Sequence, residues 1–476
     1  MDDILKPDLC IIGGGALGLG LAIKARQRGA SVVLVERRGD EPGDPAQGAL
    51  LRAAFLASAD RAQAIRTAGS LGLDNAEPKT NFRTISERAA AIADAAAARE
   101  SEERLAALGV TVLGGAAGFT DRQTLKAGDA VIRARQFVLA TGARPLVPAL
   151  PGLDQVAYFT PDTILANIRK LSHLVVIGGD ATALELAQAY RRLGSAVTVV
   201  PQGPVLSGFD PELVTVLLRA LREEGVNILD GAEIIEIQPR GQGTGIAIRR
   251  ADGTDDALDV SHILLALGRV PDLDPALLDK AKLKRERLRA DHLLVGPNGQ
   301  TSNGRVSAIG GAAGQYQPHH AARQAEVVLE RAIGNAGARI DPLRVSRLVA
   351  TAPALAQIGL VEASVALRPG QLVLRAGFSE NDAARALGAA TGAVKLIVDR
   401  KGAILGGTIL GAGAGDVAAM LAMAMERRMS AADLTGLLLP EPSLAAVLVE
   451  LGRQFQAQRP PSSLAKRRAA LRRLLP

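Results

Sequence analysis

Residues 8–36, DLCIIGGGALGLGLAIKARQRGASVVLVE, decide the fold that we expect for this chain. The apolar run Leu9–Ile12 predicts a short buried strand, and a helical pattern rich in Ala, Lys and Arg follows it. A second apolar run ends in Glu36. Between the first run and the helix stand three glycines at GxGxxG spacing: Gly13, Gly15 and Gly18. This order of strand, glycine turn, helix, strand and acid is the dinucleotide-binding fingerprint.

Each part of the fingerprint has a physical task. Gly13 permits the tight turn, Gly15 lets a pyrophosphate approach the backbone, and Gly18 lets the helix pack close to the strand. The N–H groups that open the helix face the phosphates. Glu36 would accept hydrogen bonds from the ribose hydroxyls of an adenosine. We therefore favour a nucleotide site over a purely structural glycine turn.

Composition narrows the class of protein. A length of 476 residues predicts two to four domains. No run is long and uncharged enough to span a bilayer, and the N-terminus lacks a signal-peptide pattern, so we expect a cytoplasmic protein. The single cysteine, Cys10, lies inside the first strand, where a buried, inert thiol is expected. One cysteine excludes an internal disulfide and a multi-cysteine metal site.

The nucleotide unit is repeated after a proline-rich linker, PLVPALPGL. Leu174–Ile177 predicts another strand, glycines follow, 184–193 is helical, and 197–200 is the next strand. The second copy differs from the first at three positions of the fingerprint. Where the first copy has Gly15, Gly18 and Glu36, the second has Asp180, Ala183 and Pro201. A carboxylate opposes a pyrophosphate, and proline offers a ribose no side-chain acceptor. We interpret the copy as a unit that keeps its fold and has lost ordinary NAD(P)H binding.

With these features and several later motifs, the chain resembles the pyridine nucleotide-disulfide oxidoreductases. Its motifs are most similar to those of the mercuric-reductase-like branch. The resemblance covers nearly the whole chain and includes these stretches: SEERLAALGVTVLGGAAGF, VLATGARPLVPALPGL, ALGRVPD, SAIGGAAG, TAPALAQIGL and KLIVDRKGAILGGTILGAGAGD. It implies an α/β protein with two doubly wound, Rossmann-like dinucleotide-binding domains and a C-terminal α+β dimerisation domain. The expected boundaries are 1–150 and 271–340 for the FAD domain, 151–270 for the degenerate NAD(P)-like domain, 341–455 for the dimerisation domain and 456–476 for a basic tail.

Several functional residues of the family are missing from this chain. Its two redox cysteines align at about Gly39 and Asp44, neither of which can carry thiol chemistry. The family's lysine that pairs with the glutamate matching Glu185 falls at Gly48. Its C-terminal histidine and glutamate fall at Glu441 and Ala446, and we favour an exposed interface carboxylate for the former over a general base. The aspartate that holds the ribityl chain of the flavin falls at Gly311.

The FAD positions are largely kept. From the fingerprint and the resemblance we expect FAD to be bound by Gly13, Gly14, Gly15, Ala16, Gly18, Glu36, Arg37, Ala117, Ala140, Thr141, Gly142, Gly310 and Gly311. No catalytic residue can be assigned. Disulfide, lipoamide, glutathione and mercuric-ion reduction by the family mechanism are excluded.

Two functions stay open from the sequence. The first is a FAD-dependent oxidoreductase that passes electrons from flavin directly to a small acceptor such as a quinone. The second is an inactive pseudoenzyme, a dimer that serves as a flavin-binding, regulatory or scaffold module. We favour the oxidoreductase, because an intact FAD fingerprint is easier to explain if the flavin is used. An enzyme that borrows a cysteine from a partner chain has no support in the sequence.

Other patterns predict little chemistry. The five histidines are scattered, so we expect no zinc or iron site. Aromatic residues make up only 2% of the chain, which argues against nucleic-acid binding. The net charge is +7, and the last stretch, 459–476, has six Lys or Arg residues and no acid. It forms either an amphipathic helix for an anionic membrane surface or an acidic partner, or a solvated tail.

Overall fold

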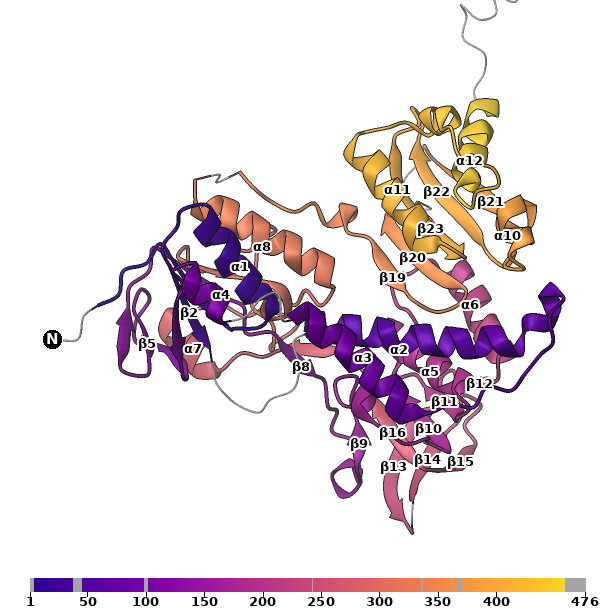
Figure 1. The fold of residues 1–476 in the computed structure, drawn as a ribbon, viewed down its shortest axis with the longest axis horizontal. Helices are drawn as coiled ribbons and strands as arrows, with labels where there is room; N and C mark the ends of the chain where they lie inside the picture. Colours follow the sequence, from indigo (N-terminus) through magenta and orange to yellow (C-terminus); the bar gives the residue numbers. More distant parts are fainter. Residues whose placement is uncertain are drawn as a thin grey trace, which may run out of the picture. The chain divides into compact units, whose positions relative to one another are not determined.

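The computed structural model describes residues 4–36, 45–97, 102–241, 243–334, 337–365 and 370–458 (Figure 1). Contacts divide the chain into two units, Met1–Ser207 with Leu221–Pro342, and Gly208–Ala220 with Leu343–Pro476. Arg37, Gly39, Asp44 and the basic tail from Arg459 onward, all named above, lie outside the described residues.

The first unit contains a parallel five-stranded sheet in the order β18-β7-β1-β2-β3. Its strands are β1 (Leu9–Ile12), β2 (Val32–Glu36), β3 (Thr111–Gly114), β7 (Gln136–Leu139) and β18 (Val306–Ala308). The strand expected at Leu9–Ile12 and the one expected in the second apolar run, which ends in Glu36, are therefore present. Because β18 pairs with β7, residues far apart in the sequence complete one sheet.

Both faces of this sheet are covered, which explains its almost uninterrupted apolar strands. On one face, alternate residues such as Leu9 and Ile11 pack against α1 (Ala16–Gln27) and α8 (Pro318–Ala332), which lie side by side in Figure 1. On the other face, Cys10 and Ile12 contact α7 (Pro275–Ala281) and a small antiparallel sheet. That small sheet comprises β4 (Ala117–Phe119), β5 (Leu125–Ala127) and β6 (Ala130–Ile132).

A second parallel sheet repeats the pattern in the order β12-β11-β10-β16-β9. Its strands are β9 (Tyr158–Phe159), β10 (His173–Ile177), β11 (Ala196–Val200), β12 (Val226–Ile228) and β16 (His262–Leu265), and α5 (Ala181–Arg192) follows β10. One face packs on an antiparallel sheet of β13 (Glu233–Arg240), β14 (Gly243–Arg249) and β15 (Asp255–Val260). The two doubly wound sheets expected from the repeat are therefore present.

Long helices follow the first βαβ unit. They are α2 (Pro45–Arg66), α3 (Phe82–Ala97) and α4 (Glu102–Ala107). Residues 98–101, between α3 and α4, are outside the described residues. The predicted linker begins in β8 (Ala143–Pro145), which pairs with β17 (Arg269–Pro271). Tyr190 of α5 packs against Phe55 of α2 and Phe82 of α3, with ring centroids 5.4 and 5.9 Å apart.

The second unit is built on an antiparallel sheet in the order β19-β20-β23-β22-β21. The strands are β19 (Arg347–Val349), β20 (Ala354–Gly359), β21 (Gln371–Gly377), β22 (Ala393–Asp399) and β23 (Ile404–Gly411). The helices of this part are α6 (Pro211–Glu223), whose last residues belong to the first unit, α9 (Glu362–Val365), α10 (Asp382–Ala386), α11 (Ala414–Glu426) and α12 (Ala446–Ala457). Phe378, Leu421 and Phe455 are central to its core. Among the described helices of the chain, none is both long and apolar enough to cross a membrane.

Candidate functional site

The glycine turn after β1 is closed by contacts that only glycine allows. The Gly13 amide donates to the Val35 carbonyl at 2.9 Å, and Gly13 has a φ of +117°. A Cβ at this position would lie 2.3 Å from the Ala140 carbonyl oxygen, and a Cβ at Gly18 would lie 2.0 Å from the Gly13 oxygen. The turn, the helix start and the end of β7 are therefore in direct contact.

The predicted ribose-binding acid lies against the same turn. A Cβ on Gly14 would stand 2.5 Å from Cδ of Glu36, so the Glu36 side chain covers this glycine. Gly15 forms the N-cap of α1 with extended backbone (φ −68°, ψ 170°) and contributes no side-chain hydrogen bond, and Ala16 begins the helix. The first N–H groups of a helix attract anions, particularly when no side chain caps them.

A second edge of the site comes from segments far away in the sequence. Gly311 approaches Gly142 so closely that a Cβ would lie 2.6 Å from the Gly142 carbonyl carbon. A Cβ at Gly310 would meet the Leu17 side chain of α1 at 2.6 Å. In the described part of the chain, the buried Oγ1 of Thr141 has no hydrogen-bond partner. Buried hydroxyls are ordinarily paired, so this atom fits the edge of a ligand site.

Most of the predicted site residues thus come together at the carboxyl ends of β1, β2 and β7. Ala117 lies at the start of β4, and the Gly115 amide two residues earlier donates to the Glu36 carbonyl at 2.8 Å. The sequence reasoning missed Gln324, a buried α8 side chain whose Oε1 accepts from the Gly310 amide at 2.8 Å. In the sequence, the only sign of this role is that Gln324 lies on α8, the helix that follows the glycine motif at 310–311. The open helix start, the glycine cradle and Glu36 suit the phosphates and ribose of a dinucleotide.

The second βαβ unit, formed by β10, α5 and β11, repeats the glycine turn with the same contacts. The Gly178 amide donates to the Val200 carbonyl at 3.0 Å, and a Cβ on Gly178 would lie 1.9 Å from the Ala266 oxygen. These contacts match those that Gly13 makes with Val35 and Ala140. The repeat inferred from the sequence therefore extends to individual backbone hydrogen bonds.

The helix start differs between the two copies. Asp180 is the N-cap of α5, and its Oδ1 accepts from the Ala183 amide at 2.8 Å. Burial raises the pKa of Asp180, while the Ala183 amide and the nearby Arg52 guanidinium oppose the rise. The N-cap side chain that Gly15 lacks at α1 is therefore present at α5, where it is a carboxylate bonded to a backbone amide of the helix.

The family's lysine is absent, but the positive charge opposite Glu185 is not. Gly48 has no side chain to offer, and Arg52, one helical turn later on α2, places Nε 2.9 Å from Oε2 of Glu185. Only 4% of the Glu185 side chain is exposed. Glu185 therefore has a cationic partner even though the family's lysine position is Gly48, because residues four apart lie on the same face of a helix.

The remaining candidate residues show no catalytic arrangement. Cys10 is fully buried in β1, and burial raises the pKa of its thiol far above the ordinary value. Glu441 is exposed, and Ala446 begins α12. His319 and His320 lie in the first turn of α8, and burial lowers the pKa of His320. Among the described residues, no three His, Cys, Asp or Glu side chains gather as a metal site would require.

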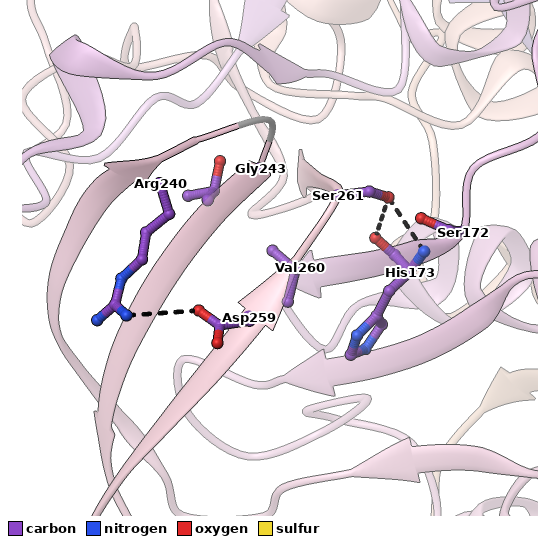
Figure 2. A pocket seen from close by; sticks show the side chains of 8 residues that line it. Ser172, His173, Arg240, Gly243, Asp259, Val260 and Ser261 are labelled. Atoms are coloured by element: carbon purple, nitrogen blue, oxygen red, sulfur yellow. Dashed lines mark hydrogen bonds and ion pairs between the residues drawn. The ribbon is translucent and has the colours of Figure 1, made fainter.

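An open pocket of about 440 Å³ lies elsewhere, at the amino ends of β10 and β16 (Figure 2). Ser261 Oγ donates to the His173 carbonyl at 2.7 Å, and Arg240 pairs with Asp259 at 3.8 Å. None of the predicted site residues lines this pocket. Nucleotides bind at the carboxyl ends of parallel strands, so we do not assign it to the candidate site.

Comparisons with known proteins agree with this architecture. Residues 7–325 match the family described as pyridine nucleotide-disulphide oxidoreductase, and residues 345–451 match its dimerisation domain. A mercuric reductase of Streptomyces lividans is 30% identical over 424 residues, which cover 86% of this chain and 88% of that protein. A dihydrolipoyl dehydrogenase of Geobacillus stearothermophilus is 27% identical over 460 residues, with 94% and 96% covered.

Solved structures show the same fold. LpdA from Mycobacterium tuberculosis superposes with a TM-score of 0.83 at 24% identity, covering 95% of this chain and 99% of that chain. The HOCl-induced flavoprotein disulfide reductase RclA from Escherichia coli, in its Cu(II) complex, gives a TM-score of 0.82 at 20% identity, covering 96% and 100%.

Proposed function

The chain belongs to the pyridine nucleotide-disulphide oxidoreductase family, a flavin-dependent family, and from this membership we propose that it is a FAD-dependent oxidoreductase without the family's thiol relay. Electrons would pass from the flavin directly to a small acceptor such as a quinone. One observation carries this proposal: the only cysteine of the chain, Cys10, is fully buried within β1. A thiol relay needs two accessible cysteines, so the acceptor must meet the flavin itself.

The residues of the first unit fit FAD. Gly13, Gly15 and Gly18 would let the pyrophosphate reach the start of α1, and Glu36 would hold the adenosine ribose. Thr141 would donate its unpaired hydroxyl at the opposite edge, where Gly142 meets Gly311. Bound flavin would supply a two-electron carrier, and its reduced form can convert a quinone to the hydroquinone. The protein residues bind and orient this group.

The test begins with the visible spectrum of the purified full-length protein. We expect a flavin spectrum, reduction by dithionite without oxygen, and rapid reoxidation by menadione but not by oxidised glutathione or lipoamide. Free FAD treated in the same way gives the background rate. A colourless protein that cannot be reconstituted with FAD would contradict the proposal, as would reoxidation by glutathione disulfide at the rate seen with menadione.

A second candidate is a catalytically inactive dimer that keeps the fold, and the flavin, as a binding or regulatory module. The carboxylate cap at the start of α5 favours it, because a unit that no longer takes NAD(P)H removes the family's source of electrons. A bound flavin that menadione reoxidises no faster than free FAD would support this candidate over the enzyme.

We also propose a homodimer, on the basis of the dimerisation domain matched at 345–451. Sedimentation equilibrium on the purified protein would test it, and a monomer at micromolar concentration would overturn it. A cytoplasmic location and a membrane or acidic partner for the basic tail stay predictions.

A further inference from the structure

The two starts of α1 and α5 occupy equivalent places in two copies of one unit. In both, the residue at the N-cap has extended backbone, with φ −68° at Gly15 and −83° at Asp180. At α1 the N-cap residue Gly15 has no side chain that could cap the helix, whereas at α5 the Asp180 carboxylate accepts from the Ala183 amide. An oxygen anion bonded to helix N–H groups is also what a dinucleotide pyrophosphate would provide. The Asp180 carboxylate thus accepts the hydrogen bond of a helix N–H group that would otherwise attract the pyrophosphate.

The loop after β11 covers the glycine turn from one side. The Leu206 amide donates to the Gly179 carbonyl at 2.8 Å, and Leu206 is only 3% exposed. A Cβ on Gly179 would be 3.2 Å from Cβ of Pro201 and 3.4 Å from Cα of Val205. The acid that would hold a ribose is replaced by Pro201, and Val205 packs over the turn.

From the other side, α2 brings Arg52 to the same helix. Its guanidinium pairs with Glu185 on the second turn of α5, and it lies near enough to Asp180 to oppose the rise that burial causes in the pKa of that carboxyl. The acid at the helix start is therefore held by an amide of α5 and by the charge of a neighbouring helix. Removing it to admit a diphosphate would break both interactions.

We propose that the second βαβ unit, formed by β10, α5 and β11, is closed to NADH and NADPH by residues of the chain itself, with Asp180 in the place of the dinucleotide's pyrophosphate. Pro201 and Val205 pack beside Gly179 in the same turn. This inference deepens the proposed function and rests on it in one respect: a FAD that works in this protein would receive its electrons from a reductant other than a nicotinamide dinucleotide.

The test measures binding by calorimetric titration of the purified full-length protein with NADH and, separately, NADPH. The wild type is expected to show a dissociation constant weaker than about 1 mM, and Asp180→Gly to bind at least about tenfold more tightly. Asp180→Asn keeps a capping side chain without the charge. It therefore distinguishes obstruction of the helix start by the side chain from repulsion between the carboxylate and the pyrophosphate. The matched control is Asn381→Gly, since Asn381 caps α10 in the same way, accepting from the Ala384 amide at 2.9 Å. This control should leave dinucleotide binding unchanged.

Micromolar binding of either dinucleotide by the wild type would overturn the inference without any variant. So would an Asp180→Gly protein that melts like the wild type and binds no more tightly. A gain with Asp180→Gly supports it, whether Asp180→Asn shares the gain or not. The titration needs no flavin turnover, so its result does not depend on whether the protein is an oxidoreductase. Failure of the proposed oxidoreductase would be seen separately, as a protein without flavin or with an unreactive flavin.

Discussion

Arg52 Nε lies 2.9 Å from Glu185 Oε2, joining α2 of the first nucleotide unit to α5 of the second. The glutamate side chain is only 4% exposed, and the arginine is 28% exposed. Breaking a buried ion pair leaves a desolvated charge without compensation. The pair is therefore a structural link between helix α2 and helix α5.

Arg52→Met should lower the free energy of unfolding by about 1–3 kcal/mol, because Glu185 loses a cationic partner in a buried position. Adding Glu185→Gln should restore more than half of that loss, since the buried charge is then gone. Urea unfolding of the two single variants and the double variant gives the coupling. An Arg52→Met protein within about 0.5 kcal/mol of the wild type would contradict this prediction.

Gly15→Asp is the reciprocal of the change found at Asp180. The extended backbone of Gly15 accepts any residue, so the variant should fold and cap α1 with its own carboxylate. We expect it to lose most of its FAD, measured as flavin released per protein after purification. The control is Gly436→Asp, at an exposed glycine with open space around it. Full flavin content in Gly15→Asp would show that a carboxylate at this position does not exclude a dinucleotide.

Thr141→Val should weaken FAD binding and leave the stability of the apoprotein nearly unchanged. Since Oγ1 of Thr141 has no partner among the described residues, removing it should change unfolding by less than about 0.5 kcal/mol. A hydrogen bond to FAD worth about 1 kcal/mol would weaken its affinity about fivefold. Fluorescence titration of the apoprotein with FAD measures this effect. Thr124→Val is the contrast: Thr124 Oγ1 accepts from Arg133 at 3.1 Å, so that variant should lose stability and keep FAD affinity.

Lys395→Met should be strongly destabilising at neutral pH. Lys395 is 4% exposed and its Nζ lies 3.0 Å from Asp210, 2.5 Å from Glu212 and 2.6 Å from Glu362. Removing it leaves these carboxylates in mutual repulsion, and we expect a loss of about 3–5 kcal/mol, as for a broken buried pair. Lys126→Met, at an exposed lysine of β5, should cost little.

The pH dependence of that loss has a definite sign. The hydrogen bond from Lys395 lowers the pKa of Glu362 below its ordinary value of 4.5, so its stabilisation is present above 4.5 and lost as the pH falls through the lowered value. Burial lowers the pKa of Lys395, but its three carboxylate partners raise it further, giving a net rise above 10.5. The stabilisation by charged Lys395 is therefore fully present below pH 10.5 and is lost as the pH rises through the raised pKa. Urea unfolding across this range should show the gap between wild type and variant shrinking at both ends.

Much of the fold was predictable because it depends on local pattern. The apolar run Leu9–Ile12, the glycine at position 13 and the acid at position 36 specify one βαβ unit, and the recurrence at 174–200 specifies another. The FAD residues that we propose in the first βαβ unit follow from the same spacing. The partner of Glu185 did not, because alignment pointed to Gly48 and only helix geometry brings Arg52 to it.

The sequence by itself determined two βαβ units with the dinucleotide-binding pattern, a single cysteine, and the replacement of a glycine by Asp180 in the second of these units. These are properties of residue identity and periodicity. Only the tertiary structure decided where the replaced side chains go: the Asp180 carboxylate bonds to the Ala183 amide, Leu206 closes on Gly179, and Gly311 meets Gly142. Such contacts join segments that are distant in the chain or depend on a side-chain direction. They are fixed by packing and by the need to satisfy buried polar groups, which no local pattern records.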